Sequence, residues 1–115
     1  MTQIVSALLL LSSFAGAAPG AEGWCQSARI TAYVRTEHGT HTYDGTPIWT
    51  DEAIAAASWN IPIGSLVDVA DYGTVRIADR GMLGSTGHVD IAVWSRAEAF
   101  ALTSVREICV RPPAW

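Results

Sequence analysis

Two aspartates, Asp79 and Asp90, stand where apolar β-type runs meet a glycine-rich connection. The runs are 74–78 (TVRIA) and 89–93 (VDIAV), and three glycines lie between them. A rigid strand fixes the position of a side chain while a loop admits a ligand, so this placement favours carboxylates that act in acid/base chemistry. Aspartate and glycine are also common turn residues, so two ordinary turn aspartates are the alternative.

Acid catalysis near neutral pH would require one of these carboxyl groups to be protonated. Its pKa would have to be raised by burial or by a nearby like charge. Asp79 and Asp90 would repel each other in this way if the fold brings them together. Arg80 would oppose that effect if its guanidinium turned inward, and the sequence leaves its direction open.

The elements that must position these residues are short strands. Alternation in 28–36 (ARITAYVRT) predicts a half-buried strand that shows Thr31 and Tyr33 on its polar face. Residues 65–71 and 73–78 read as a hairpin around a D-Y-G turn, and 105–110 as a closing strand. The polar stretch 37–50 predicts a long exposed loop, and 51–58 predicts one helical turn followed by an extended segment.

One helix is expected, from Ser95 to Leu102. Ser95 and Glu98 have the S-x-x-E spacing of a capping box, in which each side chain satisfies a backbone donor at the other position. Six short strands and one helix make the fold class mainly β, a small mixed β-barrel.

Composition bounds the partners. The chain has 115 residues, half of them hydrophobic, which indicates one globular domain. All seven basic residues are arginine and the net charge is −4, so no nucleic acid partner is expected, because phosphate binding needs a basic face. We expect a monomer.

The N-terminal run 4–18 (IVSALLLLSSFAGAA) resembles the apolar region of a signal peptide. A cut after Ala17 would make 1–17 a signal peptide and 18–27 a linker, and would place the protein in the periplasm, the cell wall or the medium. No stable membrane insertion is expected after cleavage. A buried or membrane-resting N-terminal helix is the alternative, although the run is short for a transmembrane span.

Two cysteines, Cys25 and Cys109, lie near opposite ends of the exported part. An even pair in an exported domain predicts a disulfide, and two free buried thiols are the alternative. The three histidines have no ligand-like spacing with the cysteines. We therefore expect neither a metal nor a cofactor.

The motifs in order resemble the double-psi β-barrels of cell-wall proteins. These are the three-aspartate (3D) domain, the barrel of membrane-bound lytic transglycosylase A and the rare lipoprotein A group, with expansins and family 45 glycoside hydrolases more distant. The resemblance covers 28–111 and rests on TAY at 31–33, YDGT at 43–46, IPIGS at 61–65, DRG at 79–81 and HVDI at 88–91.

The resemblance implies a six-stranded double-psi β-barrel that acts on peptidoglycan glycan strands. Asp90 matches the catalytic acid/base of the lytic transglycosylases of this fold, and Asp79 matches its partner carboxylate. The residues expected to bind the glycan are Thr31, Tyr33, Thr46, Trp49, Ser58, Trp59, Arg80 and His88. The two tryptophans would offer stacking faces to sugar rings, unless they cover the edge of the core instead.

Two positions depart from the family pattern. Ser58 stands where the relatives have an aspartate or a histidine, and Thr46 where one group has a glutamate. A serine cannot titrate near neutral pH, so any role that needs a charge at that position is lost.

Three functions follow. The first is a secreted lytic transglycosylase that cleaves the β-1,4 bond of murein, with Asp90 first protonating the leaving oxygen and then taking the proton of the muramoyl 6-hydroxyl. The alternative, favoured by Ser58 and Thr46, is a non-catalytic module that binds or loosens wall glycan, as expansin-like proteins do. The third is a secreted barrel that inhibits or engages another protein through the loop 37–50.

Overall fold

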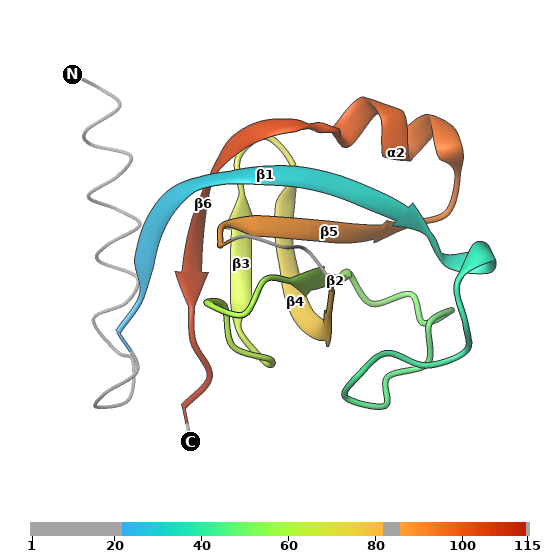
Figure 1. The fold of residues 1–115 in the computed structure, drawn as a ribbon, viewed down its shortest axis with the longest axis horizontal. Helices are drawn as coiled ribbons and strands as arrows, with labels where there is room; N and C mark the ends of the chain where they lie inside the picture. The colour runs from blue at the N-terminus through green and yellow to red at the C-terminus, as the bar shows by residue number, and fades with distance from the viewer. Residues whose placement is uncertain (1–21, 82–85, 115) are drawn as a thin grey trace.

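The structure is a computed structural model, and it describes residues 22–81 and 86–114. Its six strands form a closed barrel in the order β1-β5-β2-β4-β3-β6 (Figure 1). The strands are β1 (Trp24–Val34), β2 (Ile54–Ala57), β3 (Leu66–Val69), β4 (Gly73–Arg80), β5 (His88–Val93) and β6 (Ser104–Arg111). The other elements are a 3-10 turn, η1 (Arg35–Glu37), and the helix α2 (Arg96–Leu102). The predicted fold class is confirmed.

Alternating apolar residues fill the barrel. The side chains that meet inside it are fully buried and mostly β-branched, which suits a pleated surface. They include Ile30, Val67, Val75, Ile77, Val89, Ile91, Ile108 and Val110. The predicted signal peptide, residues 1–17, lies outside the described residues. No helix in the described ranges is long and apolar enough to cross a membrane.

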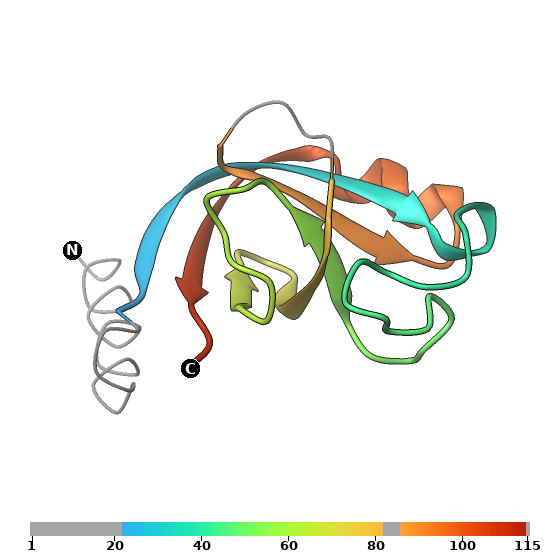
Figure 2. The same ribbon diagram turned by 60° about the horizontal axis from the view of Figure 1, so that its bottom comes forward.

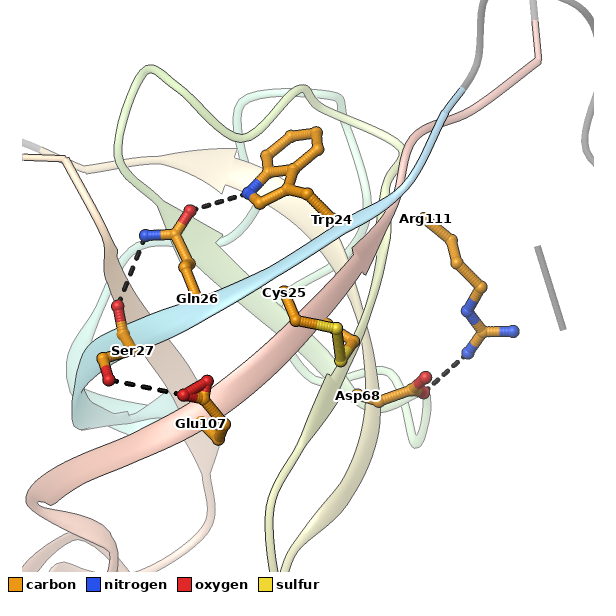
Figure 3. Close-up of a disulfide and its surroundings, with 8 residues drawn as sticks. Trp24, Cys25, Gln26, Ser27, Asp68, Glu107 and Arg111 are labelled. Carbon is orange, nitrogen blue, oxygen red and sulfur yellow. Dashed lines mark hydrogen bonds and ion pairs between the residues drawn. A yellow bond between two sulfur atoms is a disulfide. The ribbon is translucent and has the colours of Figure 1, made fainter. Parts of the chain in front are cut away.

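The first strand begins earlier than expected. Residues 24–27, which the sequence assigned to a linker, pair with β6 in an antiparallel ladder. Cys25 lies directly opposite Cys109 in that ladder, and the two form the predicted disulfide (Figure 3). Alternation between buried and exposed residues is visible in the sequence only from residue 28. Residues 24–27 are half-buried or exposed, so they carry no apolar core pattern.

The hairpin and the helix are confirmed. β3 and β4 pair around a turn in which Asp71 has φ +60° and Gly73 has φ +138°. The capping box of α2 is complete: Ser95 Oγ accepts from the Glu98 N–H and the Glu98 carboxylate accepts from the Ser95 N–H. α2 packs against β1 and β5.

The helical turn predicted at the start of 51–58 is wrong. The Thr50 hydroxyl does accept the Glu52 N–H, but residues 51 and 52 only bend and the chain then extends into β2. All four residues of β2 are buried between β4 and β5. This tertiary burial overrides the helical preference of the alanine run.

Candidate functional site

A row of side chains crosses four neighbouring strands on the outer face of the barrel. Thr31 on β1 pairs with Asp90 on β5, which pairs with Ala56 on β2, which pairs with Asp79 on β4. Paired residues point to the same face of a sheet, so both carboxylates open on one side. Their Cα atoms are about two strand spacings apart, roughly 10 Å. The small side chain of Ala56 leaves space between them.

A β-bulge places Asp79 on this face. Val75 and Ile77 point into the barrel, and strict alternation would send Asp79 after them into the core. The register between β2 and β4 shifts by one residue between Ala55 and Ala56, which inserts Ala78 as the extra residue. Bulges commonly re-aim side chains beside functional sites.

Asp90 is half-buried and held by one neutral donor. The Thr31 hydroxyl lies 2.8 Å from Asp90 Oδ1 and 2.8 Å from His88 Nε2. Burial raises the pKa of the Asp90 carboxyl, although the hydrogen bond from Thr31 opposes the shift. The structure therefore makes the proton of Asp90 harder to remove than that of an exposed aspartate.

Within the part of the chain that the structure describes, Asp79 accepts hydrogen bonds from backbone donors only. Its Oδ1 lies 3.0 Å from the Tyr43 nitrogen and 2.8 Å from the Arg80 nitrogen. The first bond ties β4 to the loop between η1 and β2. Neither Asp79 nor Asp90 forms an ion pair within the described residues.

A cavity of about 280 Å³ lies between the carboxylates and the loop. It is lined by Tyr33, His38, Gly39, His41, Ile48, Ala56, Asp79, Arg80, Gly81 and Asp90. The Tyr33 hydroxyl is buried and has no hydrogen-bond partner among the described residues. Burial, and then the charges of Asp79 and Asp90, raise the pKa of Tyr33 to about 12, so this hydroxyl stays a donor.

A second cavity, of about 620 Å³, adjoins the first. Tyr33, His38 and Asp90 line both. The second is otherwise lined by residues of the β1 end, η1, α2 and the residue after it: Ala32, Val34, Glu37, Arg96, Ala99, Phe100 and Thr103. Together the two cavities form a groove that crosses Asp90.

Arg80 turns to the loop that follows β2. Its Nη1 donates to the carbonyl oxygens of Ser58 and Ile61, at 3.0 and 2.8 Å. Its guanidinium carbon lies 4.5 Å from the ring centroid of Trp59, whose side chain remains 75% exposed. Arg80 thus borders the smaller cavity without pairing with either carboxylate.

Two expected binding residues hold the backbone together. Ser58 is buried; its hydroxyl accepts the His88 N–H at 3.1 Å and donates to Asn60 Oδ1 at 2.9 Å. It lines neither cavity. The Thr46 hydroxyl donates to Asp44 Oδ1 and accepts a hydrogen bond from Arg76 Nη2 at 3.0 Å. Thr46 also lines neither cavity. The departures from the family pattern therefore fall on residues that stabilise loops.

Trp49 lies on the loop between η1 and β2, 56% exposed, with its ring 6.0 Å from that of His41. His88 is buried, its Nε2 lies 2.8 Å from the Thr31 hydroxyl, and it lines neither cavity. Of the ten expected site residues, the structure gathers Asp79, Asp90, Tyr33 and Arg80 along the smaller cavity. Thr31 and His88 line neither cavity, but Thr31 donates a hydrogen bond to Asp90 and also contacts the His88 ring.

Sequence reasoning missed His38, whose ring packs edge-on against Tyr33 at 5.4 Å and lines both cavities. It also missed the role of Arg35, because the predicted strand 28–36 put this residue on its polar face. The strand ends at Val34, and Arg35 turns inward to donate to the carbonyl oxygens of Ile48, Thr50, Glu52 and Ala92. An arginine beside a long polar loop was the only signal for this anchor.

The loop between η1 and β2 lies at one end of the barrel (Figure 2). Ion pairs and hydrogen bonds of Arg76 hold the side of this loop opposite to Arg35. Arg76 pairs with Asp44 at 2.8 Å and with Glu52. Although burial acts in the opposite direction, bonds from Thr46, Arg76 and Thr42 hold the pKa of Asp44 well below its usual range. The hydrogen bond from Arg76 likewise lowers the pKa of Glu52.

Among the described residues, no group of three or more His, Cys, Asp or Glu side chains is placed to hold a metal ion. The groove can instead accept hydrogen bonds at two carboxylates and offer aromatic rings along its walls, where the protonated Tyr33 hydroxyl is buried. These groups suit a polyhydroxylated ligand better than an ion.

No protein-family model matches the chain, and no curated protein sequence does. Solved structures with a similar fold include the apo expansin of Clavibacter michiganensis (TM-score 0.52, 23% identity), over 80% of this chain and 53% of that one. An aspartate-to-asparagine mutant of that expansin, in complex with cellohexaose, matches with TM-score 0.51 and 22% identity over the same shares. A Streptomyces papain inhibitor matches with TM-score 0.57 and 17% identity, over 76% of this chain and 94% of that one.

At these identities the likeness concerns the fold, and this chain spans about half the length of the expansin. The expected resemblance to expansins is therefore confirmed at the level of the barrel. The 3D, transglycosylase A and rare lipoprotein A groups find no counterpart in these matches. The chain is a six-stranded, disulfide-linked β-barrel with the fold of an expansin's barrel.

Proposed function

We propose that this protein is a secreted module that binds or loosens cell-wall glycan without cleaving it. The observation that carries the proposal is the groove across Asp90. It presents two carboxylates on one face of the barrel, neither of them in an ion pair with another described residue, and the side chain of Tyr33 lines it with its hydroxyl buried in the wall. Sugar hydroxyls both donate and accept, so they can satisfy these groups together.

The comparisons support a glycan as the ligand class. One expansin with this barrel fold was crystallised in complex with cellohexaose. The Cys25–Cys109 disulfide agrees with an oxidising compartment outside the cytoplasm. Peptidoglycan strands and cellulose are the two polymers we would test, and we expect the protein to act as a monomer.

We rank lytic transglycosylase activity below glycan binding as a proposed function. The raised pKa of Asp90 has the direction that a general acid needs, because burial keeps its proton. The three structural matches named above are two expansin structures and a papain inhibitor. Ser58 moreover supplies no titratable partner, because a serine hydroxyl does not ionise near neutral pH. Its hydroxyl is already bonded to the His88 N–H and to Asn60.

A pull-down on insoluble murein and on cellulose tests the proposal. We expect depletion of the wild-type protein, binding weakened roughly tenfold in Asp79→Asn and Asp90→Asn, and no new 1,6-anhydromuramic ends. Asp51→Asn is the matched control, since Asp51 is exposed and lines neither cavity. Retention equal in all four proteins would place the binding surface elsewhere, and new anhydro ends that Asp90→Asn abolishes would establish the transglycosylase.

Protease inhibition is a second candidate function. The Streptomyces papain inhibitor matches over 94% of its own length, so a barrel of this extent occurs as a free-standing inhibitor. The loop between η1 and β2 would be the contact, because Tyr43 and Trp49 on it are 71% and 56% exposed. Papain assays with increasing protein would detect it: unchanged hydrolysis at micromolar protein would exclude this function.

A further inference from the structure

Apart from Tyr33 and Asp90, the larger cavity, beside α2, is lined by residues that the sequence did not single out. It is open over about 620 Å³ and is continuous with the carboxylate cavity through Tyr33, His38 and Asp90. A ligand held at the two aspartates therefore meets this cavity next along the groove. We propose that it binds the following units of the same glycan chain, with Phe100 as the stacking platform; this rests on the proposed glycan function.

Phe100 is the most exposed large apolar side chain of the described residues that border a cavity. It projects from α2 with 87% of its surface exposed, although α2 buries Leu102 against the barrel. A free phenyl ring on a rigid helix loses little conformational entropy when a flat apolar partner covers it. The C–H face of a pyranose ring is such a partner.

The charges beside Phe100 favour a neutral ligand. Arg96 donates through Nε and Nη2 to the Glu37 carboxylate, both at 3.1 Å, so the pair contributes no net charge to the wall of the cavity. Both side chains remain partly exposed, at 82% and 43%, and keep free donors and acceptors for hydroxyl groups. Among the described residues that line this cavity, Arg96 and Glu37 are paired with each other, and Asp90 is the acidic side chain without an ion pair.

Small side chains leave room for a sugar ring. Ala32 and Ala99 form the part of the wall between β1 and α2, where longer residues would fill the space. The volume falls within the range of pockets that hold small organic ligands. The carboxylate cavity alone, at about 280 Å³, is smaller than that range. An extended oligosaccharide would therefore use both cavities.

The test is the dependence of affinity on chain length. Calorimetric titration would compare cellohexaose with cellotriose, and the N-acetylglucosamine hexamer with its trimer. We expect the wild-type protein to bind the hexamer of one series about tenfold more tightly than the trimer. Phe100→Ala should lose roughly fivefold to tenfold in hexamer affinity and leave the trimer unchanged. Val105→Ala is the matched control, because Val105 is 74% exposed and lines neither cavity.

Three results would overturn the inference. An unchanged ratio of hexamer to trimer affinity in Phe100→Ala would show that the ring contacts no sugar. Weaker inhibition of papain by that variant, with glycan binding intact, would make this face a protein-binding surface. Failure of the wild-type protein to bind any oligomer or wall polymer would refute the proposed function itself. Wild-type binding that Phe100→Ala leaves unchanged would refute only the extended groove.

Discussion

At the scale of single residues, Asp90 is held in a state that costs stability. Because its folded pKa lies above the unfolded value, the folded protein binds more protons than the unfolded chain in the window between the two pKa values. Stability attributable to Asp90 is therefore greatest below the unfolded pKa, near 4, and declines as the pH rises through the folded pKa.

Asp90→Asn removes this cost while keeping an oxygen that accepts the Thr31 hydroxyl. We expect the variant to be more stable than wild type at pH 7, by up to about 1 kcal/mol. The advantage should shrink toward pH 3, where the wild-type carboxyl is protonated in both states. Urea unfolding at the two pH values measures it, with Asp51→Asn as control. A variant that is less stable at pH 7 would mean that a bound cation or water network offsets the burial of the charge.

Ser58 provides the second prediction at this scale. Ser58→Ala leaves the buried His88 N–H without its acceptor, so we expect a loss of about 1–3 kcal/mol in the free energy of unfolding. Glycan binding by the folded variant should be unchanged, because Ser58 lines neither cavity. Ser27→Ala is the control: its exposed hydroxyl lies 3.4 Å from Glu107, and its loss should matter little. If Ser58→Ala lost glycan binding but kept the stability of the wild-type protein, Ser58 would have to contact the glycan.

At the scale of elements, the loop between η1 and β2 depends on Arg76. The depressed pKa values of Asp44 and Glu52 mean that their stabilising contribution is present above their unfolded pKa values, near 4, and is lost as the pH falls. Arg76→Gln should therefore lower stability by about 1 kcal/mol at pH 7, because the ion pairs are partly exposed. The difference from wild type should narrow at pH 3. Thermal unfolding at both pH values checks this, and a constant difference would assign the effect to packing.

The elements were predictable where the pattern was local. The β3–β4 hairpin follows from its turn residues, and α2 from the S-x-x-E spacing at Ser95. The disulfide followed from the compartment and the even cysteine count. These features depend on residues close in sequence or on a single pairing, so one sequence is enough to find them.

The site was predictable in its residues but not in its geometry. Alternation alone sends Asp79 into the core, and only the bulge at Ala78 brings it beside Asp90. Arg35 likewise looked like a surface residue of a strand, yet its guanidinium holds the loop by four backbone carbonyls. Both outcomes depend on register and on contacts between distant segments, which no local pattern encodes.

At the scale of the whole molecule, closure of the barrel depends on the ladder between β1 and β6. This ladder joins the first strand to the last, and Cys25 and Cys109 link it covalently across 84 positions. A link over so long a loop lowers the entropy of the unfolded chain by an amount equivalent to about 4 kcal/mol. A domain of this size has a total stability of about 5–15 kcal/mol, so the disulfide supplies a large share.

The double variant Cys25→Ser, Cys109→Ser should therefore lose roughly 2–5 kcal/mol in free energy of unfolding, measured by urea denaturation without reductant. Both side chains must be replaced together, because one remaining thiol could form dimers. Asp68→Asn is the comparison on the neighbouring β3–β6 seam, where Arg111 pairs with Asp68 at the surface (Figure 3). That partly exposed pair should contribute below about 1 kcal/mol. If the double serine variant were as stable as wild type, strand pairing and core burial alone would close the barrel, and the groove over β5 would persist in a reducing environment.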